Sequence, residues 1–162
     1  MSNSLISILI TATFFVSAPL KGDDENSYME LRFLSPELAN KAVVAAVEDC
    51  TSRGYKVSAA VVDRTGNLSA FLRNPLSGAH TIKVAERKAY SAASLQTATS
   101  EMAVRTDLNF APGILLIIGG VPIDVGGHLY GGIAVAGADP QVDEECAQTG
   151  IDAIAEILDF AD

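Results

Sequence analysis

One predicted helix carries most of the side chains in this sequence that could do chemistry. The stretch SGAHTIKVAERKAYSAASLQTATSEM, residues 77–102, includes His80, one of only two histidines in the chain. It continues with the cations Lys83, Arg87 and Lys88. A neutral imidazole can ligate a metal, and a guanidinium can hold a carboxylate through two parallel hydrogen bonds. An imidazole followed by cations therefore suits a ligand that has both a metal centre and carboxylates.

The other positions of this helix carry little side-chain bulk, which leaves two hypotheses. A flat ligand could lie against a smooth helical wall, or the helix could pack closely on a sheet or another subunit, which is the commoner use of alanine. The charges also have an ordinary alternative, because Lys83 and Arg87 share a helical face with Glu86 nearby and can form a solvated or intersubunit cluster. His80 can equally be a polar residue that opens the helix. The small positions are Ala85, Ala89, Ala92 and Ala93.

Thr99, Tyr90 and His128 are further candidates, each with a structural alternative. Thr99 or Ser100 is predicted to cap a second short helix, and a hydroxyl is a poorer iron ligand than an imidazole. Tyr90 follows Arg87 by three residues and can reach either a ligand or the core. His128 lies at a predicted turn, where a surface role is favoured over metal ligation.

Several common kinds of site are not supported by any motif. The glycines of residues 131–137 lack the G-x-G-x-x-G spacing and no P-loop is present, which argues against nucleotide binding. A hydrolase would have to combine His80 with one of Asp63 and Ser94, but no nucleophile elbow or ordered triad occurs. There is also no C-x-x-C pair or Cys/His cluster for a structural zinc.

The two cysteines, Cys50 and Cys146, each fall in a predicted helix. The favoured interpretation is that both are small apolar core residues. The alternative is a disulfide between the two helices, which requires an oxidising compartment.

The charge distribution argues against nucleic acid as a partner. The 162 residues have a formal net charge of −9. Every Lys and Arg lies at or before Arg105, whereas ten acidic residues and no base follow it. Binding to phosphates needs a basic surface patch, so we interpret the acidic C-terminal part as a solvated helix face.

The hydrophobic pattern predicts an α+β fold with an antiparallel sheet of five strands and flanking helices. Ser35 and Pro36 begin a first helix that ends at Gly54. The order is then two strands, two helices, three strands and a helix. The predicted strands are residues 56–63, 68–73, 114–120, 121–127 and 129–137, and the later helices span about 81–95, a short turn from 99, and 142–160.

The amino terminus predicts export. Residues 5–20 form an apolar run of the length of a signal-peptide core, which is too short for a stable membrane span. We therefore expect a signal peptide over residues 1–22, a polar linker over 23–28 and one domain over 29–162, in the periplasm or outside the cell. The alternative is that translation starts at Met29 and the protein is cytoplasmic.

Three segments together resemble the GlcG/HbpS family of haem-binding and haem-degrading proteins. They are AERKAYSAASLQTATSEMA (85–103), GGVPIDVGGHLYGGIAVAGA (119–138) and DEECAQTGIDAI (143–154). The same domain occurs at the carboxyl end of PduO-type corrinoid adenosyltransferases. The resemblance implies a profilin-like fold, a homo-oligomer such as an octamer, and a ligand that is haem or a related tetrapyrrole, with a corrinoid as second choice.

A haem site needs an apolar wall, cations near the propionates and an axial iron ligand. On this basis we predict that His80 is the metal ligand and that Arg87 and Lys88 hold the propionates. Thr99 and Tyr90 are predicted to line the haem site. No catalytic residue is assigned, because any haem degradation would use the iron with an external reductant or peroxide.

The leading hypothesis is an exported, oligomeric haem-binding protein that sequesters or degrades haem. One alternative is a non-catalytic assembly module that docks on a sensor protein or an enzyme. A second alternative is a small enzyme that acts on an organic acid near the basic helix.

Overall fold

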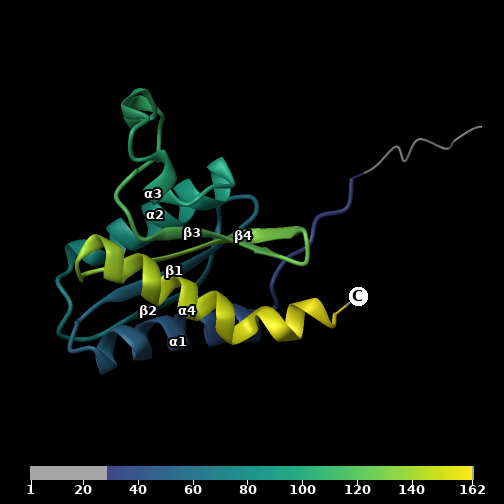
Figure 1. Cartoon of the computed structure of the whole chain (residues 1–162), viewed down its shortest axis with the longest axis horizontal. Coiled ribbons are helices and arrows are strands. Elements are labelled where there is room, and N and C mark those ends of the chain that lie inside the picture. The colour runs from purple at the N-terminus through teal and green to yellow at the C-terminus, as the bar shows by residue number, and fades with distance from the viewer. Residues whose placement is uncertain (1–28, 162) are drawn as a thin grey trace, which may run out of the picture.

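The helices and hairpins follow one another in nearly the predicted order in the computed structural model, which describes residues 29–161 (Figure 1). The predicted signal peptide (1–22) and linker (23–28) lie outside the described residues. The elements are α1 (Pro36–Ser52), β1 (Ser58–Asp63), β2 (Leu68–Arg73), α2 (His80–Leu95), α3 (Thr99–Met102), the 3₁₀ helix η1 (Thr106–Phe110), β3 (Gly120–Val125), β4 (His128–Ala136) and α4 (Pro140–Asp159).

The strands form one antiparallel sheet in the order β2-β1-β4-β3. The two hairpins, β1–β2 and β3–β4, join through their inner strands, which pair from Ser58 opposite Ala136 to Asp63 opposite Gly131. The predicted α+β class and the antiparallel sheet are confirmed. The prediction of five strands is wrong, because the sheet of the described residues has four.

The missing strand is the apolar run that the sequence placed at residues 114–120. Its last two residues reach the sheet, since the Gly119 carbonyl oxygen accepts the Val135 amide of β4 at 3.0 Å and Gly120 begins β3. Before them the backbone contacts α2 instead, where the Leu115 amide donates to Ser91 Oγ at 2.7 Å. Ile114 and Leu116 are nevertheless buried. The apolar composition therefore reflects burial of an extended segment beside α2, and burial alone does not distinguish such a segment from a strand.

Helices α1 and α4 lie side by side on one face of the sheet (Figure 1). The Ser35 hydroxyl accepts a hydrogen bond from the Leu38 amide at 3.3 Å, which confirms the predicted start of α1. The two helices cover the side chains of one face of the strands, including Val61 and Ile133. This layer contains the larger of the two hydrophobic clusters.

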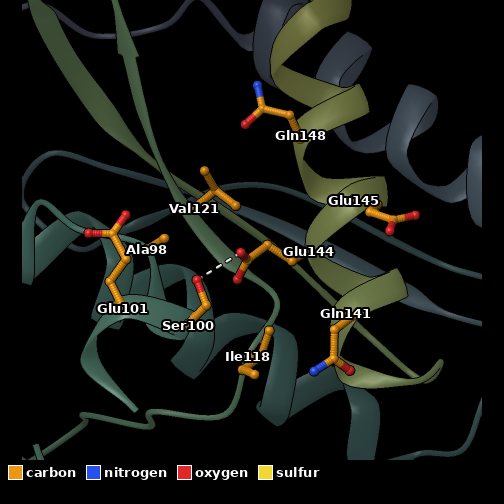
Figure 2. Close-up of a pocket in the computed structure, with 9 residues that line it drawn as sticks. All are labelled: Ala98, Ser100, Glu101, Ile118, Val121, Gln141, Glu144, Glu145 and Gln148. Carbon is orange, nitrogen blue, oxygen red and sulfur yellow. Dashed lines mark hydrogen bonds between the residues drawn. The ribbon is translucent and has the colours of Figure 1, made fainter. Parts of the chain in front are cut away.

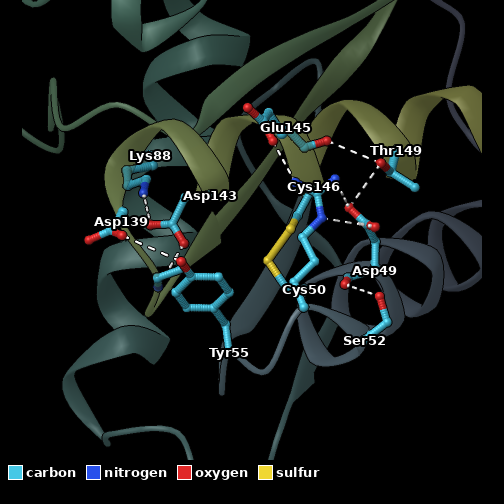
Figure 3. The surroundings of a disulfide bond; sticks show 12 residues. Asp49, Cys50, Ser52, Tyr55, Lys88, Asp139, Asp143, Glu145, Cys146 and Thr149 are labelled. Atoms are coloured by element: carbon cyan, nitrogen blue, oxygen red, sulfur yellow. Dashed lines mark hydrogen bonds and ion pairs between the residues drawn. A yellow bond between two sulfur atoms is a disulfide. The ribbon is translucent and has the colours of Figure 1, made fainter.

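A disulfide between Cys50 and Cys146 joins α1 to α4, with the Cα atoms 5.7 Å apart (Figure 3). The favoured prediction of two separate apolar cysteines is therefore wrong, and the alternative is correct. Both residues are fully buried where the two helices pack. Next to the disulfide, Arg53 bridges Asp49 of α1 and Glu145 of α4.

Helix α2 covers the opposite face of the sheet through its alanines. Ala85 and Ala89 are fully buried against the small side chains of β1 and β4. A Cβ at Gly132 of β4 would lie only 2.5 Å from the carbonyl oxygen of Ala89, so the helix backbone rests almost directly on the strand. The hypothesis of a smooth wall open to a flat ligand is wrong, and the alternative of close helix–sheet packing is correct.

The segment between α3 and β3, which carries η1, projects away from the sheet on the side of α2 (Figure 1). Over residues 29–161, no helix combines the length and the apolar character needed to cross a bilayer.

Candidate functional site

The face of α2 that points away from the sheet carries a row of polar side chains. His80, Lys83, Arg87, Tyr90 and Ser94 follow one another at intervals of three or four residues, so they lie along one side of the helix. The buried alanines occupy the other side. We call this row the outer stripe of α2.

Arg87 and Tyr90 form the best-defined part of the outer stripe. Arg87 Nη2 donates to the carbonyl oxygen of Ile114 at 2.8 Å, which holds the guanidinium beside the extended segment while it remains exposed. The Tyr90 ring fits between Gly66 and Gly113, and a Cβ at Gly66 would lie 2.7 Å from a ring carbon. Glycine at these positions therefore makes room for the ring.

A shallow cavity of about 260 Å³ lies against these two side chains. Its lining is mostly apolar, and Leu68 on its wall is 50 % exposed. An exposed cation next to an aromatic ring and an aliphatic surface can bind a ligand that is apolar over most of its area and anionic at one edge. The lining residues are Val62, Gly66, Leu68, Glu86, Arg87, Tyr90 and Gly113.

His80 lies at the first position of α2 and is exposed. Its ring rests beside Gly78, where a Cβ would be 2.7 Å from the imidazole Cε1. It does not line the cavity beside Arg87. Seven residues separate it from Arg87, which corresponds to about 10 Å along the helix axis. His80 and Arg87 thus both lie on the outer stripe and are about two helical turns apart.

Lys88 points away from the outer stripe and is fully buried. Its Nζ lies 2.9 Å from Asp143 Oδ2 of α4, and Asp143 Oδ1 accepts the Ala138 amide at 3.0 Å (Figure 3). Burial lowers the pKa of Lys88 and raises the pKa of Asp143, and the attraction between the two charges opposes both effects. Lys88 therefore has no surface available to a haem propionate, and the prediction that it holds one is wrong.

Thr99 is also buried, with 1 % of its surface exposed. Its hydroxyl accepts the Gly120 amide at 3.0 Å and so ties α3 to the start of β3. The predicted helix cap at Thr99 or Ser100 is wrong, because the N-cap is Ala98 and no side chain caps α3. Ser100 instead donates to Glu144 Oε1 at 2.8 Å.

A second and larger cavity, of about 610 Å³, lies between α3, the start of β3 and α4 (Figure 2). Three carboxylates line it, and no Lys, Arg or His does. Glu144 Oε2 is buried and has no hydrogen-bond partner in the described part of the chain. This cavity disfavours anionic ligands. Its lining residues are Ala98, Ser100, Glu101, Ile118, Val121, Gln141, Glu144, Glu145 and Gln148.

The sequence does not predict that segments far apart along the chain come together to line these two cavities. The charge pattern predicts a solvated helix face for the acidic run at 143–145, yet Glu144 lines the large cavity and Asp143 is buried. Gly66 and Leu68 belong to the β1–β2 hairpin, which no local signal connects to α2. Within residues 29–161, no group of three or more His, Cys, Asp or Glu side chains is arranged to hold a metal ion.

Comparison with known proteins gives a family model and several solved structures. The model is described as haem degrading protein HbpS-like and matches residues 34–152. A crystal structure of HbpS is 38% identical, with a TM-score of 0.75, and the alignment covers 79% of this chain and 94% of that one. No curated protein matches the chain significantly.

Two further structures extend the comparison. A double mutant of HbpS from Streptomyces reticuli is 36% identical, with a TM-score of 0.75, and the alignment covers 89% of this chain and 99% of that chain. A structure described as a PduOC:heme complex is 26% identical, with a TM-score of 0.69, and the alignment covers 76% of this chain and 96% of the other.

Proposed function

This chain belongs to the HbpS-like family of haem-degrading proteins, and on that premise we propose that it binds haem at the outer stripe of α2, beside Arg87 and Tyr90. Haem is an apolar disc with two carboxylates at one edge. The residues present fit such a group: the Tyr90 ring and half-exposed Leu68 offer apolar contact, and exposed Arg87 offers a propionate partner. The exposed Arg87 guanidinium beside this apolar wall is the observation that carries the proposal.

Charge favours this surface over the larger acidic cavity. Haem brings two negative carboxylates, and the larger cavity is lined by three more. Glu145 pairs with Arg53, but Glu101 and Glu144 form no ion pair with a described cation. Like charges in a partly buried site repel strongly. The cavity at Arg87 is smaller than a typical ligand site, which measures about 300–1,000 Å³, so this chain contacts only part of the disc and a second copy covers the rest.

We propose His80 as the iron ligand, because its imidazole is exposed on the same stripe as Arg87. Lys88 and Thr99 are left out of the proposed site, since their polar atoms are buried and hydrogen-bonded inside the fold. Bound haem would supply the redox chemistry of its iron, while the residues of the chain bind and orient it.

Self-association is part of the proposal, and the projecting segment supports it. Phe110 of η1 is 90 % exposed and Val104 before it is 83 % exposed. Covering such exposed apolar side chains with another protein surface removes them from water and lowers the free energy of the system. We propose a homo-oligomer, with the octamer implied by the family resemblance as the expected size.

Export is supported by the disulfide. Disulfides persist in oxidising compartments and are rare in the cytosol, where thiols are kept reduced. We therefore propose that residues 1–22 direct export and that the domain works in the periplasm or outside the cell. Mass determination of the mature amino terminus tests this: removal of the first 22 residues is expected, and an intact terminus or a start at Met29 contradicts it.

A haemin titration followed at the Soret band tests the proposed function. We expect a saturable spectral shift, a changed band position in His80→Ala, and about tenfold weaker binding in Arg87→Gln, since a charge-assisted hydrogen bond is lost. Lys41→Gln is the matched control, because Lys41 is an exposed cation on α1, across the sheet from α2. An oligomer that gives no spectral response would favour an assembly module that docks on a sensor or an enzyme.

Haem degradation needs a separate assay. Loss of the Soret band under ascorbate or peroxide, together with release of iron and faster than in a protein-free control, would show that the protein promotes the reaction.

A further inference from the structure

A second arginine stands near the proposed site, in the turn of the β1–β2 hairpin. Arg64 is exposed and forms no hydrogen bond or ion pair with any described residue. Other arginines are occupied: Arg53 and Arg105 bind carboxylates, and Arg73 binds backbone carbonyls. In a chain with 20 acidic and 11 basic residues, an uncommitted guanidinium is uncommon.

Two small cavities place Arg64 next to the haem surface proposed above. One, of about 70 Å³, is lined by Arg64, Gly66, Tyr90 and Ser94, together with Thr65. It shares Gly66 and Tyr90 with the cavity beside Arg87, so the two hollows meet at the Tyr90 ring.

The other small cavity lies on the far side of Arg64 and measures about 180 Å³. Arg32 and His128 line it with Arg64, and Glu30 is its single acidic residue. Arg64 therefore lines two hollows, and Glu30 is the one carboxylate among the residues that line them. Arg87 lines the cavity on one side of the junction at Tyr90 and Arg64 lines the cavity that Ser94 also borders, so both guanidiniums belong to hollows that share Tyr90.

The turn that carries Arg64 is held rigidly by its neighbour Asp63. Asp63 Oδ1 accepts hydrogen bonds from the Thr65 amide at 2.7 Å, from the Thr65 hydroxyl at 2.7 Å and from the Asn67 amide at 3.0 Å. Gly66 completes the turn with a φ of 87°, a value that favours glycine. A fixed backbone lowers the entropy lost when Arg64 binds a ligand.

We propose that Arg64 binds a second anionic group of the ligand that Arg87 holds, so that the surface selects aromatic molecules with two carboxylates. This inference rests on the proposed function and names the substrate class of the same site. Each guanidinium pairs with one carboxylate, and the Tyr90 ring, which lines both cavities, contacts the apolar body. An aromatic ligand with one carboxylate or none loses at least one of these contacts.

The test compares three probes on the full-length chain: haemin, metal-free protoporphyrin IX and protoporphyrin IX dimethyl ester. Porphyrin fluorescence anisotropy reports the last two without any contribution from iron. Arg64→Gln is expected to weaken binding of haemin and of protoporphyrin about tenfold, through loss of one charge-assisted hydrogen bond. Its affinity for the dimethyl ester, which has no carboxylate, is expected to equal that of the wild type.

Lys41→Gln is again the control and is expected to bind all three probes as the wild type does. Thermal unfolding checks that Arg64→Gln keeps the fold. Haemin binding that is weakened by Arg87→Gln but not by Arg64→Gln overturns this inference and leaves the proposed function standing. Equal weakening for the dimethyl ester also overturns it, because the effect would not involve carboxylates. Absence of haemin binding to the wild type overturns both.

Discussion

Lys88 and Arg87 are adjacent in the sequence, yet one is fully buried and the other exposed. Consecutive residues of a helix are separated by about 100° of rotation, which is enough for one of them to turn toward the protein while the other faces solvent. Lys88 is tolerated inside because Asp143 neutralises it at 2.9 Å. A Cβ at Gly119 would clash with Lys88 Nζ, so glycine at that position makes room for the ion pair.

A double-mutant cycle on this ion pair gives the first prediction at the residue scale. Lys88→Met leaves Asp143 buried without its partner, and we expect the free energy of unfolding to fall by about 3–5 kcal/mol. Asp143→Asn keeps an acceptor for the Ala138 amide but leaves the lysine charge unpaired. The double variant should be less destabilised than the sum of the two single variants, as measured by urea unfolding. Additive losses would show that the two charges are not coupled.

The sequence did not distinguish the buried cation from the exposed one. In most helices, large apolar residues mark the side that faces the core, but the buried side of α2 has none and consists of alanine and serine together with Thr81 and Lys88. The weak hydrophobic pattern of α2 predicts the helix and its candidate cations, but it does not predict which cation is exposed to solvent. For Tyr90 the sequence left two roles open, contact with a ligand or packing in the core. Its actual position beside Gly66 depends on a hairpin that is distant in the sequence.

At the scale of elements, the disulfide is the strongest single link between α1 and α4. The cysteines are 96 residues apart in the sequence. Cross-linking a loop of about 100 residues lowers the entropy of the unfolded chain by an amount equivalent to roughly 4–5 kcal/mol in the chain-entropy model. The bond therefore accounts for a large fraction of the stability expected for a domain of this size.

Removal of this link is the corresponding prediction. The Cys50→Ser, Cys146→Ser double variant should lose about 3–5 kcal/mol of unfolding free energy relative to the oxidised wild type. The wild type treated with a reductant serves as the control and should approach the stability of the variant. Identical urea midpoints with and without reductant would contradict a structural role for the bond.

Elements with strong end signals were predicted well, and those without them were not. Ser35 and Pro36 fixed the start of α1, and the turn at Gly66 fixed the first hairpin. Residues 114–118 have no such signal, and burial of Ile114 and Leu116 gives the run a strand-like apolar character without strand pairing. The sequence favoured two separate cysteines over the disulfide, because the distance between the two helices depends on tertiary packing that a local sequence pattern does not predict.

At the scale of the whole molecule, the projecting segment makes association between copies testable. Phe110→Asp places a charge where the proposed interface needs an apolar contact, so light scattering should report a smaller particle. Asn109→Asp adds the same charge at the exposed neighbouring residue and should leave the mass much closer to that of the wild type. Equal masses for Phe110→Asp and the wild type would remove Phe110 from the interface.

The bond between the first and last helices also sets an order of events during synthesis. Cys146 leaves the ribosome 96 residues after Cys50, which at 5–20 residues per second corresponds to about 5–20 s. Throughout that interval the earlier thiol has no native partner, and the surface of α1 that α4 will cover is open to water. The native bond can form only when the carboxyl-terminal helix arrives, so truncated chains ending before residue 146 should leave Cys50 without its native partner and be preferred substrates for proteases.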